Sequence, residues 1–253
     1  MNILKYICLP GLLVSGDIQT VSAVESKTDK NPNILDAGYN DFGFMGSKEM
    51  QTPNIDALTS EGVVFTDAHV AATVSSPSRA CLITGRYGHR FGYECNLSDR
   101  TNGLPLEEET IAEVFKTNGY RTAAIGKWHL GSRDEQHPNN RGFDLFYGMK
   151  AGGRDYFYNE KKSDRPGDER NLLLNDRQVK FEKYLTDAFS EKAVEFINES
   201  SQPFMMYLAY NAVHTPMQAT DEDMAKFEGH PRQKLAAMTY ALDRGVGTVI
   251  RGL

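Results

Sequence analysis

The strongest constraint on the fold is a nearly continuous apolar run at residues 204–209, Phe-Met-Met-Tyr-Leu-Ala. A strand with apolar residues at every position is buried on both faces, which is typical of a parallel sheet covered by helices. Residues 120–125 read as a second such strand, and helical patterns alternate with these runs. This alternation predicts an α/β fold with a largely parallel sheet flanked by helices.

Capping residues indicate where several other helices begin and end. Thr52-Pro53 pairs an N-cap residue with proline at the first helical position, and Gly62 ends that pattern. Residues 110–113 form a capping box that opens a helix stopped at Gly119, Thr186 opens another helix, and residues 231–250 form an amphipathic helix. We expect a further strand at residues 63–65, and a charged surface excursion rather than sheet at residues 153–182.

Composition excludes several classes of protein. With 28 Lys and Arg against 34 Asp and Glu, the formal net charge is -6, so the basic excess of a duplex nucleic-acid binder is missing. No stretch of about 18 apolar residues is present, which argues against a membrane span. The 3 cysteines cannot build a disulfide scaffold, and spacing alone does not decide whether Cys81 and Cys95 pair.

Residues 1–23 resemble an export signal. Lys5 precedes a short apolar run, and Val21-Ser22-Ala23 has the small residues of a cleavage site. This predicts a periplasmic or secreted protein whose folded part lies within residues 24–253. The alternative is an unstructured start on a cytosolic protein.

The most informative segment is residues 75–85, Ser-Ser-Pro-Ser-Arg-Ala-Cys-Leu-Ile-Thr-Gly. We expect Ser76 to cap a helix that starts at Pro77 and stops at Gly85, with Ser75 just before the helix N-terminus. The backbone N–H groups and the helix dipole favour an anion there, and Arg79 adds a second positive group. A hydroxyl in that place suggests a nucleophile for a charged ester, whereas the plain alternative is a capped helix without chemistry.

This segment matches the signature S-x-P-S-R-x-x-x-x-T-G of the type I sulfatases at every fixed position, so the chain resembles that family. The resemblance extends over residues 31–253 through further motifs at residues 33–39, 52–56, 125–131, 141–144 and 210–216. It implies an alkaline-phosphatase-like fold and hydrolysis of sulfate monoesters of aryl or carbohydrate alcohols. It further implies that a sulfatase-maturing enzyme oxidises Ser75 to formylglycine.

The resemblance also implies roles for individual residues. Arg79 would hold the formylglycine, Lys127 would bind sulfate oxygens, and His129 would help to take the proton of the attacking hydroxyl. His214 would donate a proton to the leaving group. Calcium (Ca2+) would be bound by Asp36 and by residue 75. His69, His89, His137 and His230 match no catalytic position, and we expect them to be structural or exposed.

Two departures from the family pattern bear on calcium. The opening strand is short, because Ile34-Leu35 leads directly into Asp36 where the family has paired aspartates. The sequence ends at Leu253, before the Asp-Asn pair and the C-terminal subdomain of the family. Calcium takes 6–8 oxygen ligands, so we expect an incomplete site. The alternatives are therefore an inactive remnant, a sulfate- or sulfosugar-binding module and, more remotely, a phosphatase of the same superfamily.

Overall fold

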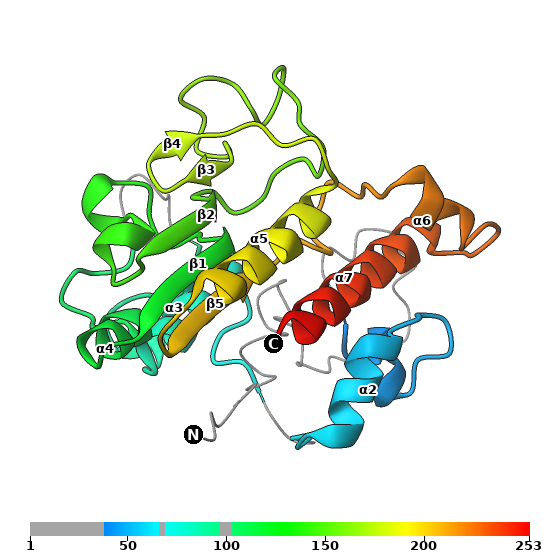
Figure 1. Cartoon of the computed structure of the whole chain (residues 1–253), viewed down its shortest axis with the longest axis horizontal. Coiled ribbons are helices and arrows are strands. Elements are labelled where there is room, and N and C mark those ends of the chain that lie inside the picture. Colours follow the sequence, from blue (N-terminus) through cyan, green and yellow to red (C-terminus); the bar gives the residue numbers. More distant parts are fainter. Residues whose placement is uncertain (1–37, 66–68, 97–102) are drawn as a thin grey trace.

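The computed structural model describes residues 38–65, 69–96 and 103–253. The predicted export signal and Asp36 lie outside these residues. A five-stranded sheet with the order β4-β3-β2-β1-β5 forms the centre of the described part (Figure 1). Its strands are β1 (Arg121–Lys127), β2 (Leu145–Met149), β3 (Leu173–Leu174), β4 (Arg177–Gln178) and β5 (Phe204–Ala209).

The sheet is largely parallel, as the sequence predicts. β1 pairs in parallel with β2 on one side and with β5 on the other, whereas the short strands β3 and β4 are antiparallel. β5 has the predicted bounds, and every residue of β1 after the first is buried. The predicted α/β class is therefore confirmed, while β2 was not predicted.

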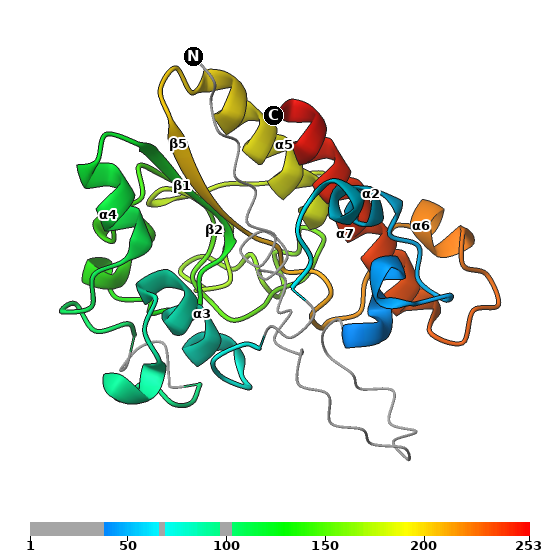
Figure 2. The ribbon, with the colours of Figure 1, turned by 90° about the horizontal axis from the view of Figure 1, so that it is seen from below.

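Helices cover both faces of the sheet. Figure 2 shows α3 and α4 on one side of the sheet and α5 and α7 on the other, with α2 packed against α7. The α-helices are α2 (Pro53–Glu61), α3 (Ser75–Thr84), α4 (Ile111–Thr117), α5 (Leu185–Glu199), α6 (Asp221–Ala225) and α7 (Gln233–Gly252). None of the helices in these described ranges is long and apolar enough to cross a membrane.

Two apolar cores follow from the alternation of side chains along the strands. Ala123 and Ile125 of β1 face the core under α5 and α7, while Ala124 faces the core under α3 and α4. In β5, Leu208 lies in the first core and Tyr207 in the second. The sheet is thus buried on both faces, which explains the continuous apolar run of β5.

Local signals fix the ends of the helices. At α4, the Thr110 side chain accepts a hydrogen bond from the Glu113 N–H, and the Glu113 carboxylate accepts one from the Thr110 N–H, so the predicted capping box is confirmed. Thr52 precedes α2 but does not cap it, because its hydroxyl bonds Asp56 and the Gly43 N–H instead. α7 confirms the amphipathic helix, with Leu235, Met238, Leu242, Val246 and Val249 buried.

Two predictions about secondary structure were wrong. Residues 63–65 form no strand, and Val63 and Phe65 are 73% and 63% exposed, because no described strand lies alongside to pair with them. Residues 153–182 are more than a surface excursion, since β3 and β4 extend the sheet within them. This segment also contains a completely buried ion pair between Arg154 and Asp164. The many charged residues of this segment led to the wrong prediction, because they gave no sign of β3 and β4.

Candidate functional site

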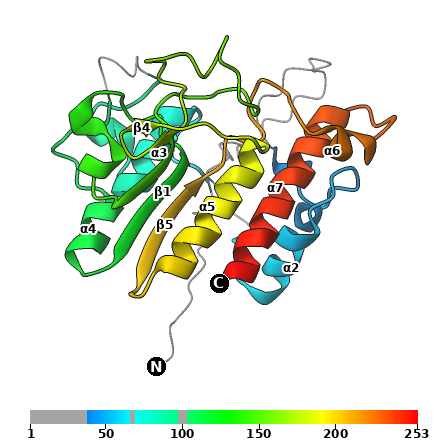
Figure 3. The same cartoon turned by 45° about the horizontal axis from the view of Figure 1, so that its top comes forward.

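The polar motifs meet at the carboxyl edge of the parallel strands (Figure 3). β1 ends at Lys127 and leads into residues 128–131, β2 leads into residues 150–155, and β5 leads into residues 210–216. The N-terminus of α3 approaches the same edge, because Arg79 of α3 contacts the backbone of Lys127. Open α/β sheets bind ligands beyond the carboxyl ends of their strands, so this edge is the candidate site.

Ser75 lies at the centre of this edge as the first residue of α3, and it is buried with 8% of its surface exposed. Its Oγ lies 3.2 Å from Nε of Arg79 and 2.9 Å from Nδ1 of His129. A guanidinium group only donates hydrogen bonds, so Oγ accepts the bond from Arg79. The hydroxyl proton of Ser75 can therefore point at Nδ1 of His129. This is the pairing of a nucleophile with a base.

The start of α3 differs from the prediction. The helix begins before Pro77, and Ser76 does not cap it. The Ser76 hydroxyl instead donates to the His129 carbonyl at 2.8 Å and contacts the Tyr93 hydroxyl at 2.5 Å. The Ser76 N–H donates to the side chain of Asn96, and proline has no N–H. Attraction of an anion therefore depends more on nearby cationic side chains than on backbone donors of this helix. Gly85, with φ of 66°, ends the helix as predicted.

Arg79 joins three elements at the site. Its Nη1 donates to the Lys127 carbonyl at 3.0 Å and to the Tyr207 hydroxyl at 2.9 Å, which connects α3 to β1 and β5. Arg79 is 4% exposed and Lys127 is 1% exposed. Placing two cationic side chains away from water is costly, and such groups are characteristic of sites that bind a negative charge. The Tyr207 contact was not predicted, because it depends on the pairing of distant strands.

His129 is held in an unusual backbone conformation, with φ of 56°. A non-glycine residue in this left-handed region costs about 1–2 kcal/mol. Two hydrogen bonds fix it there, from its N–H to the Lys150 carbonyl at 3.0 Å and from the Ser76 hydroxyl to its own carbonyl. Strain of this kind clusters at functional sites, where it aims a side chain. Here the strained residue presents Nδ1 to Ser75.

Two adjacent glycines pack against the two histidines. A Cβ on Gly152 would lie 2.6 Å from Cε1 of His129, and a Cβ on Gly153 would lie 3.0 Å from Nδ1 of His214. The backbone at residues 152–153 therefore packs against both imidazole rings. Neither glycine was predicted to matter, although a Gly-Gly pair in a loop is a signal of close backbone approach.

Each glycine substitution is expected to disturb a different one of the two histidines. Gly152→Ala would push the His129 ring away from Ser75. If this site turns over the ester that the sequence predicts, we expect kcat to fall by about 10- to 100-fold, because catalytic groups tolerate little displacement. The alanine side chain of Gly153→Ala would make a looser contact, with His214 alone, and we expect a smaller fall in kcat. Steady-state kinetics checks the activities, and thermal melting of each variant serves as the control for folding. Equal activities of both variants and the wild type would contradict this packing.

His214 is oriented by its own backbone. Its Nδ1 lies 2.8 Å from the Thr215 carbonyl, which can only accept, so Nδ1 carries a hydrogen. A proton exchanged between His214 and a ligand therefore moves through Nε2. The Tyr156 hydroxyl contacts the carbonyls of Asn211 and His214 and holds this loop in place.

The described residues do not by themselves fit a calcium site. Within residues 38–65, 69–96 and 103–253, no group of three or more His, Cys, Asp or Glu side chains could hold a metal ion. Ser75 is the one predicted ligand in these ranges, and Asp36 lies outside them. Asp41, a nearby spare carboxylate, is already bound by Arg232 at 2.9 Å and by the Gly38 N–H at 2.7 Å.

The other histidines and the cysteines have different surroundings, and His69 and His89 are exposed. His137 bonds the Asn175 carbonyl and packs edge-on against Phe146, and His230 accepts a hydrogen bond from the Arg232 N–H. Burial lowers the pKa of His137, which favours the neutral ring in this structural role. Cys81 is buried and Cys95 is exposed, and both are free thiols, which resolves the pairing that the sequence left open.

Comparison with known proteins is consistent with this geometry. The family model described as Sulfatase matches residues 36–253. The chain is 34% identical to the uncharacterized sulfatase YdeN of Escherichia coli, over 81% of the chain and 40% of that protein. It is 33% identical to human arylsulfatase G, over 96% of the chain and 53% of that protein.

Solved structures agree with the fold. The crystal structure of Ps i-CgsB in complex with k-i-k-neocarrahexaose is 44% identical, with a TM-score of 0.81 over 87% of this chain and 53% of that one. A sulfatase structure from Bacteroides fragilis, at 23% identity and a TM-score of 0.64, supports the same alkaline-phosphatase-like fold.

The chain spans about half the length of the curated relatives that it matches. The match nevertheless covers most of this chain, and it includes the segment with Ser75, Arg79, Lys127, His129 and His214. The chain therefore belongs to the type I sulfatases, a family of sulfuric ester hydrolases.

Proposed function

We propose that the protein hydrolyses sulfate monoesters of aryl or carbohydrate alcohols, with residue 75 as the nucleophile after a sulfatase-maturing enzyme has oxidised it to formylglycine. The observation that carries this proposal is the position of Ser75 Oγ, in contact with both Nε of Arg79 and Nδ1 of His129. Hydration of the aldehyde supplies two hydroxyls on one carbon, one to attack sulfur and one to expel sulfate afterwards.

The surrounding residues fit this modification. Arg79 donates a hydrogen bond to an oxygen at position 75, which would hold that oxygen and stabilise negative charge on it. His129 lies within hydrogen-bond distance of the same oxygen and would accept the proton of the attacking hydroxyl. Both contacts already form with the serine, so little movement is needed after oxidation.

Lys127 and His214 complete the proposed reaction. Lys127, a buried cation at the end of β1, would bind sulfate oxygens and neutralise charge that develops as the ester bond breaks. His214 would give a proton to the leaving alcohol through Nε2, since its Nδ1 is bonded to Thr215. No step is assigned to calcium, because the described residues supply one of the two predicted ligands and no acidic cluster.

The neighbours favour a carbohydrate ester among the possible substrates. Ps i-CgsB was solved with k-i-k-neocarrahexaose, and a further neighbour, at 25% identity and a TM-score of 0.62, was solved with its substrate D-glucosamine-2-N,6-O-disulfate. Both ligands are carbohydrates. We therefore propose a sulfated glycan as the natural substrate, with small aryl sulfates as convenient test substrates.

Mass spectrometry of the peptide that contains residue 75 tests the proposal most directly. We expect the protein, produced together with a serine-type maturing enzyme, to lose two hydrogens at Ser75, and aryl sulfate hydrolysis to follow the modified fraction. A plain serine has no second hydroxyl and would remain sulfated. Unmodified Ser75 in the presence of the maturing enzyme would overturn the proposed reaction.

A second candidate is a module that binds sulfate or a sulfosugar without turnover. The buried cations Arg79 and Lys127 favour it, because they would bind a sulfate group whether or not a bond is broken. The two candidates differ in a simple way: a binding module retains affinity for inorganic sulfate whether or not Ser75 is oxidised, and it releases no alcohol from an aryl sulfate.

Export to the periplasm or the exterior remains part of the proposal. It rests on residues 1–23 of the sequence, where a short apolar run precedes small residues. Determination of the N-terminal residue of the mature protein tests it, and a new N-terminus near residue 24 is expected.

A further inference from the structure

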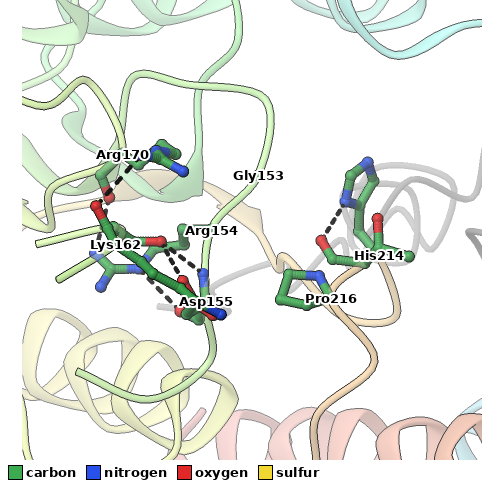
Figure 4. Close-up of a pocket in the computed structure, with 9 residues that line it drawn as sticks. Gly153, Arg154, Asp155, Lys162, Arg170, His214 and Pro216 are labelled. Atoms are coloured by element: carbon green, nitrogen blue, oxygen red, sulfur yellow. Dashed lines mark hydrogen bonds between the residues drawn. The ribbon is translucent and has the colours of Figure 1, made fainter. Parts of the chain in front are cut away.

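A cavity of about 440 Å³ adjoins the candidate site at His214. Figure 4 shows Arg154, Asp155, Lys162 and Arg170 on one side of this cavity, with His214 and Pro216 on the other. Its volume lies in the range of about 300–1,000 Å³ that is usual for small-ligand pockets. The cavity is linked to the nucleophile through Gly153 and Gly152, which touch His214 and His129 in turn.

The wall opposite His214 is fixed by buried polar contacts. Arg154 binds both oxygens of Asp164 at 2.7 and 2.8 Å, and neither side chain is exposed. Asp155 is 5% exposed, and its two oxygens accept hydrogen bonds from Ser163 and Gln218. The charges of Arg154 and the acceptor oxygens of Asp155 are therefore already engaged within the protein.

The two remaining charged side chains that line the cavity are both cations. Arg170 pairs with Asp168 at 2.6 Å, yet 41% of its side chain is exposed, so part of its guanidinium can reach a ligand. Asp168 raises the pKa of Arg170 through this hydrogen bond, which keeps the guanidinium charged. Within the part of the chain that the structure describes, no carboxylate lies within 4.0 Å of the Lys162 ammonium, which is exposed.

We propose that this cavity holds a sugar ring of the substrate and that Lys162 and Arg170 bind a second anionic group on it, a sulfate or a carboxylate. This inference rests on the proposed function and narrows it to glycans that carry a negative charge besides the ester at the nucleophile. Exposed ammonium and guanidinium donors at one end, with the ester at His214 at the other, match a ligand charged at two points.

Binding to the Ser75→Ala protein tests the inference without turnover. Isothermal titration compares three ligands: inorganic sulfate, a monosulfated disaccharide and the same disaccharide with a second sulfate on the neighbouring sugar. We expect the second sulfate to tighten binding by about tenfold, as hydrogen bonds to charged groups do. Lys162→Gln should abolish most of this gain. Lys161→Gln removes the same charge one residue away and outside the cavity lining, and it should retain the gain.

The outcomes separate the two proposals. If sulfate and the monosulfated ligand bind but the second sulfate adds nothing, the inference is wrong and the proposed function stands. If Lys161→Gln and Lys162→Gln reduce the gain equally, general attraction explains it and the inference is also wrong. If none of the three ligands binds a protein with a wild-type melting temperature, both proposals fall. A gain that disappears at 0.5 M salt in the Ser75→Ala protein, and is missing when Lys162→Gln is added to it, would support the charge contact.

Discussion

Ser75→Ala is expected to abolish the proposed sulfate ester hydrolysis, with kcat/KM for an aryl sulfate reduced by roughly 10⁴-fold or more. Alanine cannot be oxidised to formylglycine and offers no oxygen to attack sulfur. It also removes the partner of Arg79 and His129, which contact Ser75 Oγ at 3.2 and 2.9 Å. Loss of these two hydrogen bonds should cost only about 1–3 kcal/mol of stability, so the fold should persist.

Ser78→Ala is the matched control on the same helix. The Ser78 hydroxyl donates to the Ala72 carbonyl at 2.6 Å, away from Arg79 and His129. The same atom is deleted, but we expect activity within a few-fold of the wild type, provided that mass spectrometry shows equal oxidation of Ser75. Comparable activity of Ser75→Ala and Ser78→Ala would exclude residue 75 as the nucleophile. Kinetics with a chromogenic aryl sulfate, corrected for the modified fraction, makes this comparison.

Much of the sheet could be predicted from the sequence, because its signals are local. The run at residues 204–209 is apolar at every position, and it became β5 with those bounds. The same logic failed at residues 63–65, where two valines and a phenylalanine are exposed. Strand propensity describes a residue that fits a pleated and partly buried surface, and it cannot supply the neighbouring strand. β2 was missed for the converse reason. Its short sequence gives only a weak local signal, and the strand forms because it pairs with β1.

Contacts of the candidate site could be predicted where both residues lie in the same sequence motif. Ser75 and Arg79 lie one helical turn apart, so their contact follows from the sequence once the segment is helical. The contact between Ser75 and His129 required the resemblance to a family, since 54 positions separate them. Gly152 and Tyr207 were missed, because close approach and a hydrogen bond across strands depend on tertiary packing rather than on spacing.

The error at Ser76 has a similar origin. Serine before proline is a common N-cap, and the local pattern alone favours that reading. In the structure the hydroxyl faces the interior, where the His129 carbonyl and the Tyr93 hydroxyl are stronger competitors. This hydrogen bond matters for the site, because the Ser76 hydroxyl helps to hold the strained backbone of His129. Ser76 thus contributes to the position of the proposed base rather than to the helix.

Of the substitutions proposed for this protein, Asp164→Asn should reduce the free energy of unfolding most, because it leaves the Arg154 charge buried without its partner. The side chains of Arg154 and Asp164 are 0% exposed, and burial already lowers the pKa of Arg154. Breaking a buried pair from one side costs about 3–5 kcal/mol. Arg154 also lies 4.6 Å from the ring centroid of Phe181, and Asp164 accepts a hydrogen bond from the Asn159 N–H at 2.7 Å, so the pair also holds these two residues in place.

Asp168→Asn supplies the contrast on the same segment. It breaks the pair with Arg170, whose side chain is 41% exposed, and pairs of this kind contribute about 0–1 kcal/mol. Urea unfolding of both variants at pH 7 should therefore separate them by about 2 kcal/mol or more. If Asp164→Asn were no less stable than Asp168→Asn, the cavity wall opposite His214 would not be rigid. The ring-binding role assigned to that wall would then lose its structural basis, because a mobile wall cannot hold Lys162 and Arg170 toward a ligand.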